Sequence, residues 1–531
     1  MDWILSGEKI RCSVAEKPAI SRLSASGTPA LHAACGRYRA KRNRTMASHR
    51  IPSRGWAVIT FIGFLSVVIS SSGVAQQSTA LSVLTTAIDK EVESDLFDGA
   101  IAAVVVRDCL TDRVLYEQHA DLLLRPASNA KLFTSAAAFL SLPRTYSMET
   151  TAGVLDSGRR VLRCSGGADP LLTVQDIQKL AEIAAPTIDS TLDTLYMDAS
   201  LLNDNFYGSG WMWDDESDPF MPFLNAFSLE GNSIRISMKS PSKRGLPVEV
   251  SVFPSSNMIT VENMLLSGRR TRIDVTKQPR SNNIVLRGTL AAGKRRTNTV
   301  SMWRPQDIVA EMLLDQLRQN GINVDSTVVV HSEGCGVPLA LHSVGHDLKE
   351  VLAEMNKESD NLCAEMALRH LAVFRGAKSG VRDKDGLAAM TSVLARNGLD
   401  LDGLHLKDGS GISFYNLVTA RCISDLLSMM SRHKDFQLYA ATLAVGGRSG
   451  TLEGRMKDLS KGQMFWGKTG TISGVSALSG YAQAPQGRLV SVVMLMQNFA
   501  GKHKPYREVQ DRIVRHCITY SAALKSVRKP Q

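Results

Sequence analysis

The sequence predicts a mixed α+β (α/β) fold, in which an antiparallel sheet carries helices and a large strand-rich insert interrupts the chain. Two observations lead to this prediction. Helical patterns, with apolar side chains every three or four residues, gather toward the two ends of the chain, and short alternating patterns fill its middle from about residue 146 to 335. Near the C-terminus two strand patterns precede a last helix, and helices packed on a sheet bury the apolar faces of both.

The N-terminal region has the pattern of an export signal. Trp56 to Ile69 forms a 14-residue apolar run that follows Arg50 and Arg54 and precedes small residues ending at Ala75. This order is typical of a secretory signal, and the run is shorter than the roughly 20 residues of a membrane span. We therefore expect an exported protein of the periplasm or cell envelope, with residues 1–75 as extension and signal peptide. An uncleaved anchor is the alternative.

Residues 1–45 precede the charged end at which a signal peptide normally begins, and Met46 stands at that end. We therefore predict that translation starts at Met46; a long basic arm is the alternative. Residues 1–75 carry +8 of the total net charge of +11, which leaves only +3 for residues 76–531. This balance is poor evidence for a nucleic-acid partner, and none is expected. Membrane contact is expected only through an uncleaved leader.

The first elements of the mature chain follow from short-range patterns. Apolar spacing predicts a helix over residues 79–94. Residues 100–107 and 113–118 predict a β-hairpin, because polar turn residues separate two strand patterns. A helix over residues 130–140 cannot continue far past Pro143, which has no backbone N–H to donate.

The middle of the chain is predicted as an inserted region of one or two domains, residues 146–336, within a main domain made of residues 76–145 and 337–531. Its predicted strands are 146–154, 192–198, 233–238, 247–253, 271–275, 283–288 and 327–331, with helices near 174–184 and 305–320. After the insert, helices are predicted over 347–356, 361–374, 386–396, 419–432 and 505–524, and strands over 476–484 and 489–496.

Eight cysteines are widely and irregularly spaced, and no C-x-x-C pair occurs. This spacing implies neither a metal site nor a disulfide framework. No cofactor and no metal are expected.

Three short motifs stand in order along the chain: Ser128-Asn129-Ala130-Lys131, Ser359-Asp360-Asn361 and Lys468-Thr469-Gly470. Each also occurs elsewhere by chance, so the context decides. Ser128 precedes an apolar helix, on which a serine and a lysine one turn apart share a face. Burial would lower the pKa of Lys131 and allow it to act as a base for Ser128. A capping serine beside a surface lysine is the alternative.

The other two motifs also have suitable contexts. Ser359 lies between two predicted helices, and Lys468 follows an apolar run and leads into a hairpin. Gly470 would let a substrate backbone approach the edge of that strand. A solvated lysine on an edge strand is the alternative for Lys468. All three motifs in this order are typical of serine acyl-enzymes that react with penicillin.

These residues resemble the D-alanyl-D-alanine carboxypeptidase/endopeptidase family of class C low-molecular-mass penicillin-binding proteins, peptidase family S13. The 231 residues from Ser128 to Ser359 suit the inserted domains of that family. Further similar segments are Arg125-Pro126, Asn356-Lys357-Glu358, Ala364-Glu365, Asp408-Gly409-Ser410-Gly411, Gly450-Thr451-Leu452 with Arg455, and Gly210-Trp211-Met212-Trp213-Asp214-Asp215. The resemblance covers nearly the whole mature chain and implies a penicillin-binding/β-lactamase-like transpeptidase domain.

The resemblance implies a serine-type D-Ala-D-Ala carboxypeptidase or DD-endopeptidase that acts on peptidoglycan stem peptides. Ser128 would attack the carbonyl between two D-alanines, and Lys131 would take its proton. Ser359 and Lys468 would pass a proton to the leaving amine, while Asn361 would hydrogen-bond the substrate amide.

The resemblance also assigns substrate-binding residues. Lys468 and Thr469 would bind the terminal carboxylate, with Gly470 beside them admitting the substrate backbone, and the backbone N–H groups of Ser128 and Thr471 would form the oxyanion hole. Asp215 would contact the free amine of the diamino acid in the peptide.

β-Lactams are expected as covalent inhibitors, because the acidic residue that a class A β-lactamase uses for deacylation has no clear counterpart. Two alternatives stay open: a β-lactamase or esterase of the same fold, and a non-catalytic peptidoglycan- or β-lactam-binding protein.

Overall fold

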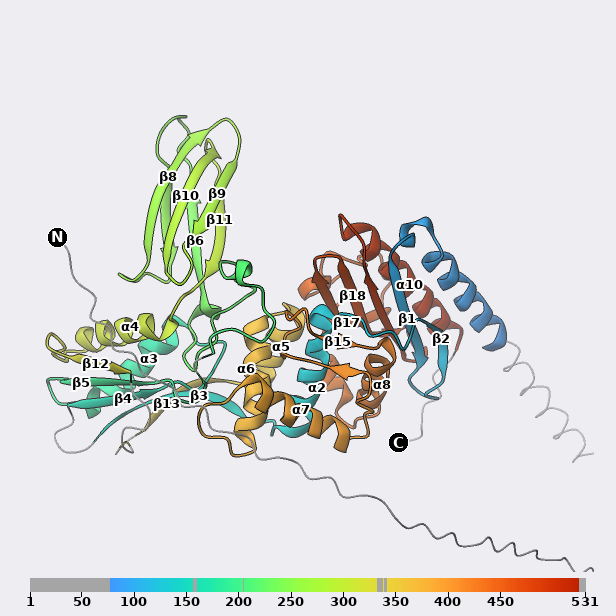
Figure 1. Ribbon diagram of the computed structural model, residues 1–531, viewed down its shortest axis with the longest axis horizontal. Helices are drawn as coiled ribbons and strands as arrows, with labels where there is room; N and C mark the ends of the chain where they lie inside the picture. Colours follow the sequence, from blue (N-terminus) through green and yellow to red (C-terminus); the bar gives the residue numbers. More distant parts are fainter. Residues whose placement is uncertain (1–76, 156–159, 204, 332–337, 339–340, 525–531) are drawn as a thin grey trace, which may run out of the picture. The chain divides into compact units, whose positions relative to one another are not determined.

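The computed structural model describes residues 77–155, 160–203, 205–331, 338 and 341–524 (Figure 1). The predicted signal peptide and Met46 lie outside these residues. Within the described residues no helix is both long and apolar enough to span a bilayer. The five cysteines of this part that the structure describes are buried thiols without disulfide bonds: Cys109, Cys164, Cys363, Cys422 and Cys517.

The main domain is built on a six-stranded antiparallel sheet in the order β16-β17-β18-β19-β1-β2. Its strands are β16 (Ala444–Val445), β17 (Met464–Ile472), β18 (Val475–Gln483), β19 (Val490–Gln497), β1 (Ile101–Asp108) and β2 (Val114–Gln118). The predicted hairpin at the start of the chain is therefore confirmed, and it joins the C-terminal strands. All residues of β19 are buried, because the sheet has helices on both faces.

The two faces of the sheet belong to two separate hydrophobic clusters. Ala103 and Val105 of β1 pack in one cluster with α2 (Lys131–Ser141) and α8 (Ala420–Ser431). The alternate residues of β1 pack in the other cluster with α10 (Lys504–Ala523) and the helix over residues 77–92. This alternation is the two-residue period of a strand that is buried on both sides.

Helices on the first face (Figure 1) flank the first two predicted motifs, whereas the third lies on β17. These helices are α2, α5 (Leu348–Lys357), α6 (Asn361–Phe374), α7 (Asp383–Arg396), α8 and α9 (Phe436–Ala440). Asp347 caps α5 by accepting a hydrogen bond from the Glu350 amide, and Asp360 caps α6 by accepting one from the Cys363 amide. Asp347 fixes the N-terminal end of α5, the helix before Ser359, and Asp360 fixes the N-terminal end of α6, the helix after it. The first turn of α7 begins earlier than predicted, because acidic side chains at a helix N-terminus favour the helix.

The region between β2 and α5 contains three further sheets. A five-stranded sheet, β12-β5-β4-β3-β13, packs with α3 (Val174–Ala184) and α4 (Pro305–Gln319), and two three-stranded sheets have the orders β8-β10-β9 and β11-β6-β7. Their strands are β3 (Ser147–Val154), β4 (Val161–Ser165), β5 (Thr194–Asp198), β6 (Ser233–Lys239), β7 (Glu249–Phe253), β8 (Thr260–Gly268), β9 (Arg272–Lys277), β10 (Asn283–Ala291), β11 (Arg295–Ser301), β12 (Val328–His331) and β13 (His342–Asp347).

The strand-rich character of this region was predicted, but four of its strands were not: β4, β8, β11 and β13. In β11 five of seven residues are exposed, and in β13 only one of six is buried. Strands without a buried face lack the apolar alternation on which a sequence-based prediction depends. The boundaries at residues 146 and 336 stay a prediction.

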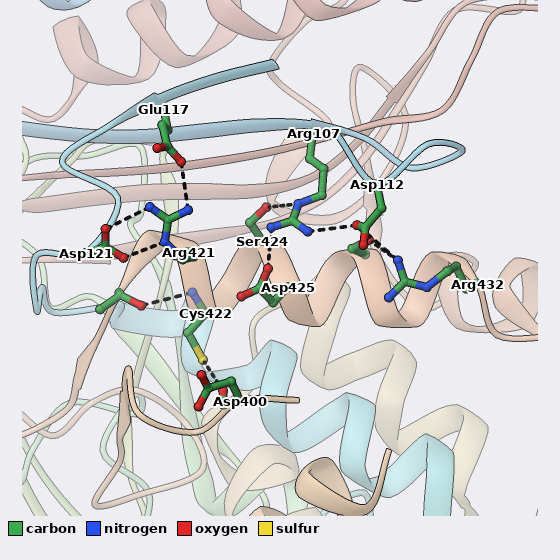
Figure 2. A network of polar contacts seen from close by, with 12 residues as sticks. Arg107, Asp112, Glu117, Asp121, Asp400, Arg421, Cys422, Ser424, Asp425 and Arg432 are labelled. Carbon is green, nitrogen blue, oxygen red and sulfur yellow. Dashed lines mark hydrogen bonds and ion pairs between the residues drawn. The ribbon is translucent and has the colours of Figure 1, made fainter. Parts of the chain in front are cut away.

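A network of ion pairs joins the hairpin of β1 and β2 to α8 (Figure 2). The Arg107 guanidinium, 10% exposed, pairs with Asp425 of α8 and with Asp112 at 2.9 Å, and its Nε donates to Ser424 at 3.2 Å. Arg421, also on α8, makes a more exposed pair with Asp121 at 2.6 Å. The network fixes α8 to the hairpin of β1 and β2 on the first face of the sheet.

Replacing Arg107 with methionine should lower the free energy of unfolding by about 2 kcal/mol, since Asp425 and Ser424 would lose a nearly buried partner. Arg421→Met is the matched control, because its pairs with Glu117 and Asp121 are solvent-exposed and should contribute less than about 1 kcal/mol. Urea denaturation of both variants would test this. Equal losses would show that burial of Arg107 does not determine its contribution.

Candidate active site

Ser128 lies in a 3₁₀ turn, Ala127–Ala130, that runs directly into α2. The apolar sequence of α2 buries that helix almost entirely, and Lys131 in its first turn is buried with it. Lys131 Nζ donates to Ser128 Oγ at 3.0 Å. Burial lowers the pKa of Lys131 to about 8. The pair therefore has the geometry and the electrostatics of a serine with its own base.

Lys131 Nζ has two further acceptors, the Asn361 side-chain oxygen at 2.5 Å and the Ser410 carbonyl at 2.6 Å. Asn361 begins α6, so the first and second motifs meet at one ammonium group. Three acceptors surround Nζ, and the lysine side chain is fully buried. This arrangement excludes the surface-lysine alternative for Lys131.

A buried carboxylate supports the loop that carries Ser410. Glu365 Oε1 accepts hydrogen bonds from the Gly409 amide at 3.0 Å and the Ser410 amide at 2.9 Å, and its Oε2 pairs with Arg369 at 2.8 Å. Asp408, also buried, accepts from the Gly411 amide at 2.8 Å. The Ser410 carbonyl, which accepts a hydrogen bond from Lys131, is thus held in position by Glu365 of α6.

Gly411 packs directly against the turn that carries Ser128. Its φ is +89°, and a Cβ placed on it would lie 1.9 Å from the Ala127 carbonyl oxygen. No side chain fits there unless the nucleophile segment moves. The glycine therefore determines how closely the loop approaches Ser128.

Gly411→Ala should reduce the rate of acylation by a β-lactam by about a hundredfold, because displacement of Ser128 by about 1 Å is enough to disturb attack. Gly398→Ala is the matched control: Gly398 has φ +88° but no atom within 4 Å of the added Cβ. The control should lose about 1 kcal/mol of stability from its backbone and keep its rate. Stopped-flow acylation and urea denaturation would separate the two effects, and equal rates would contradict the prediction.

The third motif meets the second through Lys468, which is fully buried on β17. Lys468 Nζ donates to Ser359 Oγ at 2.7 Å and to the Thr469 carbonyl at 3.0 Å. Burial, and then the charge of Lys131, lower the pKa of Lys468 well below its ordinary value. Ser359 has φ +68°, a left-handed conformation that costs a non-glycine residue about 1 kcal/mol or more and that often marks a functional site.

The edge of β17 is open beside the motif, because β16 pairs only with Trp466 and Gly467. Thr469 Oγ1 donates to Thr451 Oγ1 at 2.8 Å, and Thr471 Oγ1 accepts from Arg507 at 3.2 Å. Gly470 also has a packing role, beside the one predicted for it. A Cβ on it would lie 2.9 Å from both the Asn129 side-chain nitrogen and the Pro126 carbonyl oxygen, so this glycine permits close packing of β17 on the nucleophile turn.

The family model described as "D-Ala-D-Ala carboxypeptidase 3 (S13) family" matches residues 84–518 of this chain. The chain belongs to that family. It is a serine-type D-Ala-D-Ala carboxypeptidase, as the family resemblance implied.

Individual relatives agree with this assignment. The D-alanyl-D-alanine carboxypeptidase of an Actinomadura species is 30% identical over 460 residues, which cover 81% of this chain and 83% of the relative. The crystal structure of penicillin binding protein 4 from Haemophilus influenzae superposes with a TM-score of 0.70 at 23% identity, over 81% of this chain and 99% of that one. The predicted fold class is thereby confirmed.

The insert of this S13 carboxypeptidase supplies two contacts to the site that the sequence did not reveal. The Phe220 carbonyl accepts a hydrogen bond from the Asn361 side-chain nitrogen at 2.6 Å, and Trp211 Nε1 donates to Asp408 at 3.0 Å. A cavity of about 480 Å³ lies between the insert and the second motif, and Phe220, Ser359 and Asn361 are among its lining residues. A backbone carbonyl has no sequence signature, so the contact of Phe220 could not be predicted. The Trp211 segment was identified only by its family resemblance.

Asp215 of the S13 carboxypeptidase is not brought into direct contact with the other predicted residues. It lies in a short 3₁₀ turn, Trp213–Asp215, and no hydrogen bond or ion pair among the described residues joins its side chain to Ser128, Lys131 or Asn361. Partial burial, with Asp214 and Asp218 nearby, raises the pKa of its carboxyl.

Proposed function

We propose that this carboxypeptidase releases the terminal D-alanine of peptidoglycan stem peptides through an acyl-enzyme on Ser128. The observation that carries the proposal is the position of Lys131 Nζ. This buried group contacts Ser128, Asn361 and the Ser410 carbonyl at the same time. A lysine whose pKa is about 8 is neutral in a useful fraction of molecules near neutral pH.

In the first step, neutral Lys131 takes the proton of Ser128 while Oγ bonds to the carbonyl carbon of the penultimate residue. The backbone N–H groups of Ser128 and Thr471 are proposed to hold the oxyanion, which is the interaction that usually contributes most to such a reaction. The C–N bond then breaks, and the leaving amine takes a proton through Ser359 and Lys468, whose contact is 2.7 Å. After D-alanine has left, water attacks the acyl carbon, the ester bond to Ser128 Oγ breaks, Oγ regains a proton, and the shortened peptide leaves as a carboxylic acid.

The free carboxylate of the substrate distinguishes a carboxypeptidase from other acyl-transfer enzymes. We assign its binding to Lys468, Thr469 and the open edge of β17. Lys468 has a lowered pKa without a ligand. A carboxylate nearby would favour its charged form, so substrate binding and the charge of Lys468 are coupled.

β-Lactams are proposed to acylate the same serine and to stay bound. The penicillin binding protein 4 of Haemophilus influenzae has been crystallised with a β-lactam, which supports this proposal for a chain of the same fold. The apolar run over residues 56–69 supports export of the enzyme to the periplasm or cell envelope, where its substrate lies.

Fluorescent penicillin is the direct test of the acyl-serine. The purified protein should retain a stable label, and Ser128→Ala should retain none. Label on both proteins would overturn the assignment of Ser128, and label that disappears within seconds would indicate a β-lactamase. Digestion of muropeptides by the same preparation would then show whether cleavage of crosslinks accompanies release of terminal D-alanine.

Asp215 is proposed to bind the free amine of the diamino acid in the stem peptide. Asp215→Asn should raise the KM for a peptide with a free amine by about tenfold and leave kcat unchanged, because the contact is made equally in the ground state and the transition state. The neighbouring, exposed Asp214→Asn is the matched control and should change neither constant. An equal rise in KM for the acetylated peptide would remove Asp215 from this role.

A further inference from the structure

The two three-stranded sheets of the insert form a strongly basic lobe, residues 233–301 (Figure 1). Between residues 235 and 296 thirteen lysines and arginines stand against three acidic residues, a net charge of +10. Residues 76–531 carry only +3 in total, so the rest of that part carries −7. The small net charge of residues 76–531 is therefore the sum of a strongly basic lobe and an acidic remainder.

Most of these cations lie at one end of the lobe, where three loops converge. The Gly245 amide donates to the Ser267 carbonyl at 2.8 Å, and the Ser240 amide donates to the Lys294 carbonyl at 2.9 Å. The Ala292 amide donates to the Gly268 carbonyl at 3.0 Å. These bonds join three loops with their adjoining strand ends, residues 240–247, 267–272 and 291–296, into one surface, which we call the basic tip. Its cations are Lys243, Arg244, Arg269, Arg270, Arg272, Lys294, Arg295 and Arg296, and all eight are exposed.

The charge of the basic tip is not neutralised from within the protein. Among the described residues none of the eight cations makes an ion pair with a carboxylate. Glu249, one of the three acidic residues of the lobe, pairs at 3.1 Å with Lys239, which is not one of the eight. Eight like charges repel one another and destabilise the lobe, so an external anionic surface would relieve a cost already present in the fold.

Apolar side chains accompany the cations. Leu246 is 42% exposed and Leu266 is 44% exposed. The segments that carry them run side by side, because the Ser267 amide donates to the Leu246 carbonyl at 2.8 Å. Exposed leucines beside arginines are unfavourable for a surface that meets only water or a soluble polyanion. The combination suits the interface of a bilayer, where apolar side chains enter the headgroup region and cations meet phosphates.

We infer that the basic tip binds the surface of an anionic phospholipid bilayer. This surface lies in the insert and uses none of the residues assigned to catalysis. Clusters of four to eight lysines and arginines bind anionic leaflets through the sum of about 1 kcal/mol for each cation. The inference adds a membrane contact to the one expected through the leader, and it does not depend on whether the leader is cleaved.

Sedimentation of the full chain with vesicles of phosphatidylglycerol and phosphatidylcholine tests the inference. Replacing Arg269, Arg270 and Arg295 together with glutamine should weaken partitioning by about a hundredfold. The matched control replaces Lys384, Arg396 and Lys434 with glutamine; these exposed residues lie on or beside helices of the main domain, and the net charge changes equally. Both variants should hydrolyse a soluble peptide at the wild-type rate. Equal partitioning of the two variants would overturn the inference.

The leader also contains cations and an apolar run, so a localised measurement is needed. Hydrogen exchange of the wild type should slow in the three loops of the basic tip when anionic vesicles are added. Unchanged exchange there would overturn the inference even if the protein sediments.

Leu246→Ser with Leu266→Ser should weaken vesicle binding and leave binding of inorganic polyphosphate unchanged. Tight polyphosphate binding, with no effect of the two leucines on vesicles, would instead assign the basic tip to a soluble polyanion.

Discussion

Lys131→Met should lower the rate of Ser128 acylation by at least about a thousandfold, since a positioned general base contributes about 10² to 10⁴ and the variant also loses the bond to Asn361. Methionine has nearly the same length and no charge, so the buried site is expected to stay filled. The buried Ser410 carbonyl would lose its donor, at a cost of about 1–3 kcal/mol that removal of a buried ammonium partly offsets. The variant should therefore be folded and unreactive, as measured by near-UV circular dichroism and by penicillin labelling.

The pH dependence of the wild type follows from the same residue. Lys131 accepts a proton only when it is neutral, and burial lowers its pKa to about 8. The second-order rate of acylation should therefore rise by about tenfold for each pH unit below pH 8 and level off above it. Lys434→Met, at an exposed position, should leave both the rate and the profile unchanged. A wild-type rate that is flat between pH 6 and pH 8 would remove Lys131 as the base.

Glu365→Ala should lower the free energy of unfolding by about 3–5 kcal/mol, the cost of leaving a buried charge without its partner. Arg369, with a side chain only 3% exposed, would lose its carboxylate, and the amides of Gly409 and Ser410 would lose an acceptor. Acylation should fall as well, because the Ser410 carbonyl holds Lys131. Thermal unfolding and stopped-flow acylation measure the two effects.

Two further variants separate charge from geometry at this position. Glu365→Gln keeps an acceptor for the two amides but not the charge for Arg369, so it should lose stability and retain more of the rate than the alanine variant. Glu508→Ala removes an exposed glutamate that pairs with Lys504 at 3.7 Å, and its stability should change by less than about 0.5 kcal/mol. A Glu365→Ala protein as stable as this control would show that Glu365 does not support the loop.

The catalytic residues could be predicted because their chemistry depends on short motifs. Ser128 and Lys131 are one helical turn apart, so local spacing alone places them side by side. The contact of Lys131 with Asn361, 230 residues further along the chain, was not predicted, because resemblance assigned Asn361 only to the substrate amide. Glu365 was noticed as part of a similar segment, but its role depends on a loop more than 40 residues away. Nothing local distinguishes a glutamate that supports such a loop from a surface one.

The same limit applies to the fold. Helices such as α3 and α6 have apolar patterns that determine their own positions, and their predicted ranges agree with the structure. Strands β8 and β11 have mostly exposed residues and exist because neighbouring strands supply hydrogen bonds. Summing the charges of residues 76–531 likewise concealed the basic lobe, since a sum over a long segment cancels regions of opposite sign.

The pairing of β1 with β19 has a consequence for how the protein folds. Ile101 pairs with Gln497 and Asp108 with Val490, so the partners are 382 to 396 residues apart in the chain. Bringing such distant segments together carries a large loop-closure entropy and slows folding. The insert can collapse around its own core while the chain is still being made. The six-stranded catalytic sheet cannot form until its C-terminal strands have been synthesised. A ribosome-bound chain without residues 490–497 would present β1 with one edge unpaired, and it would depend on chaperones to avoid aggregation.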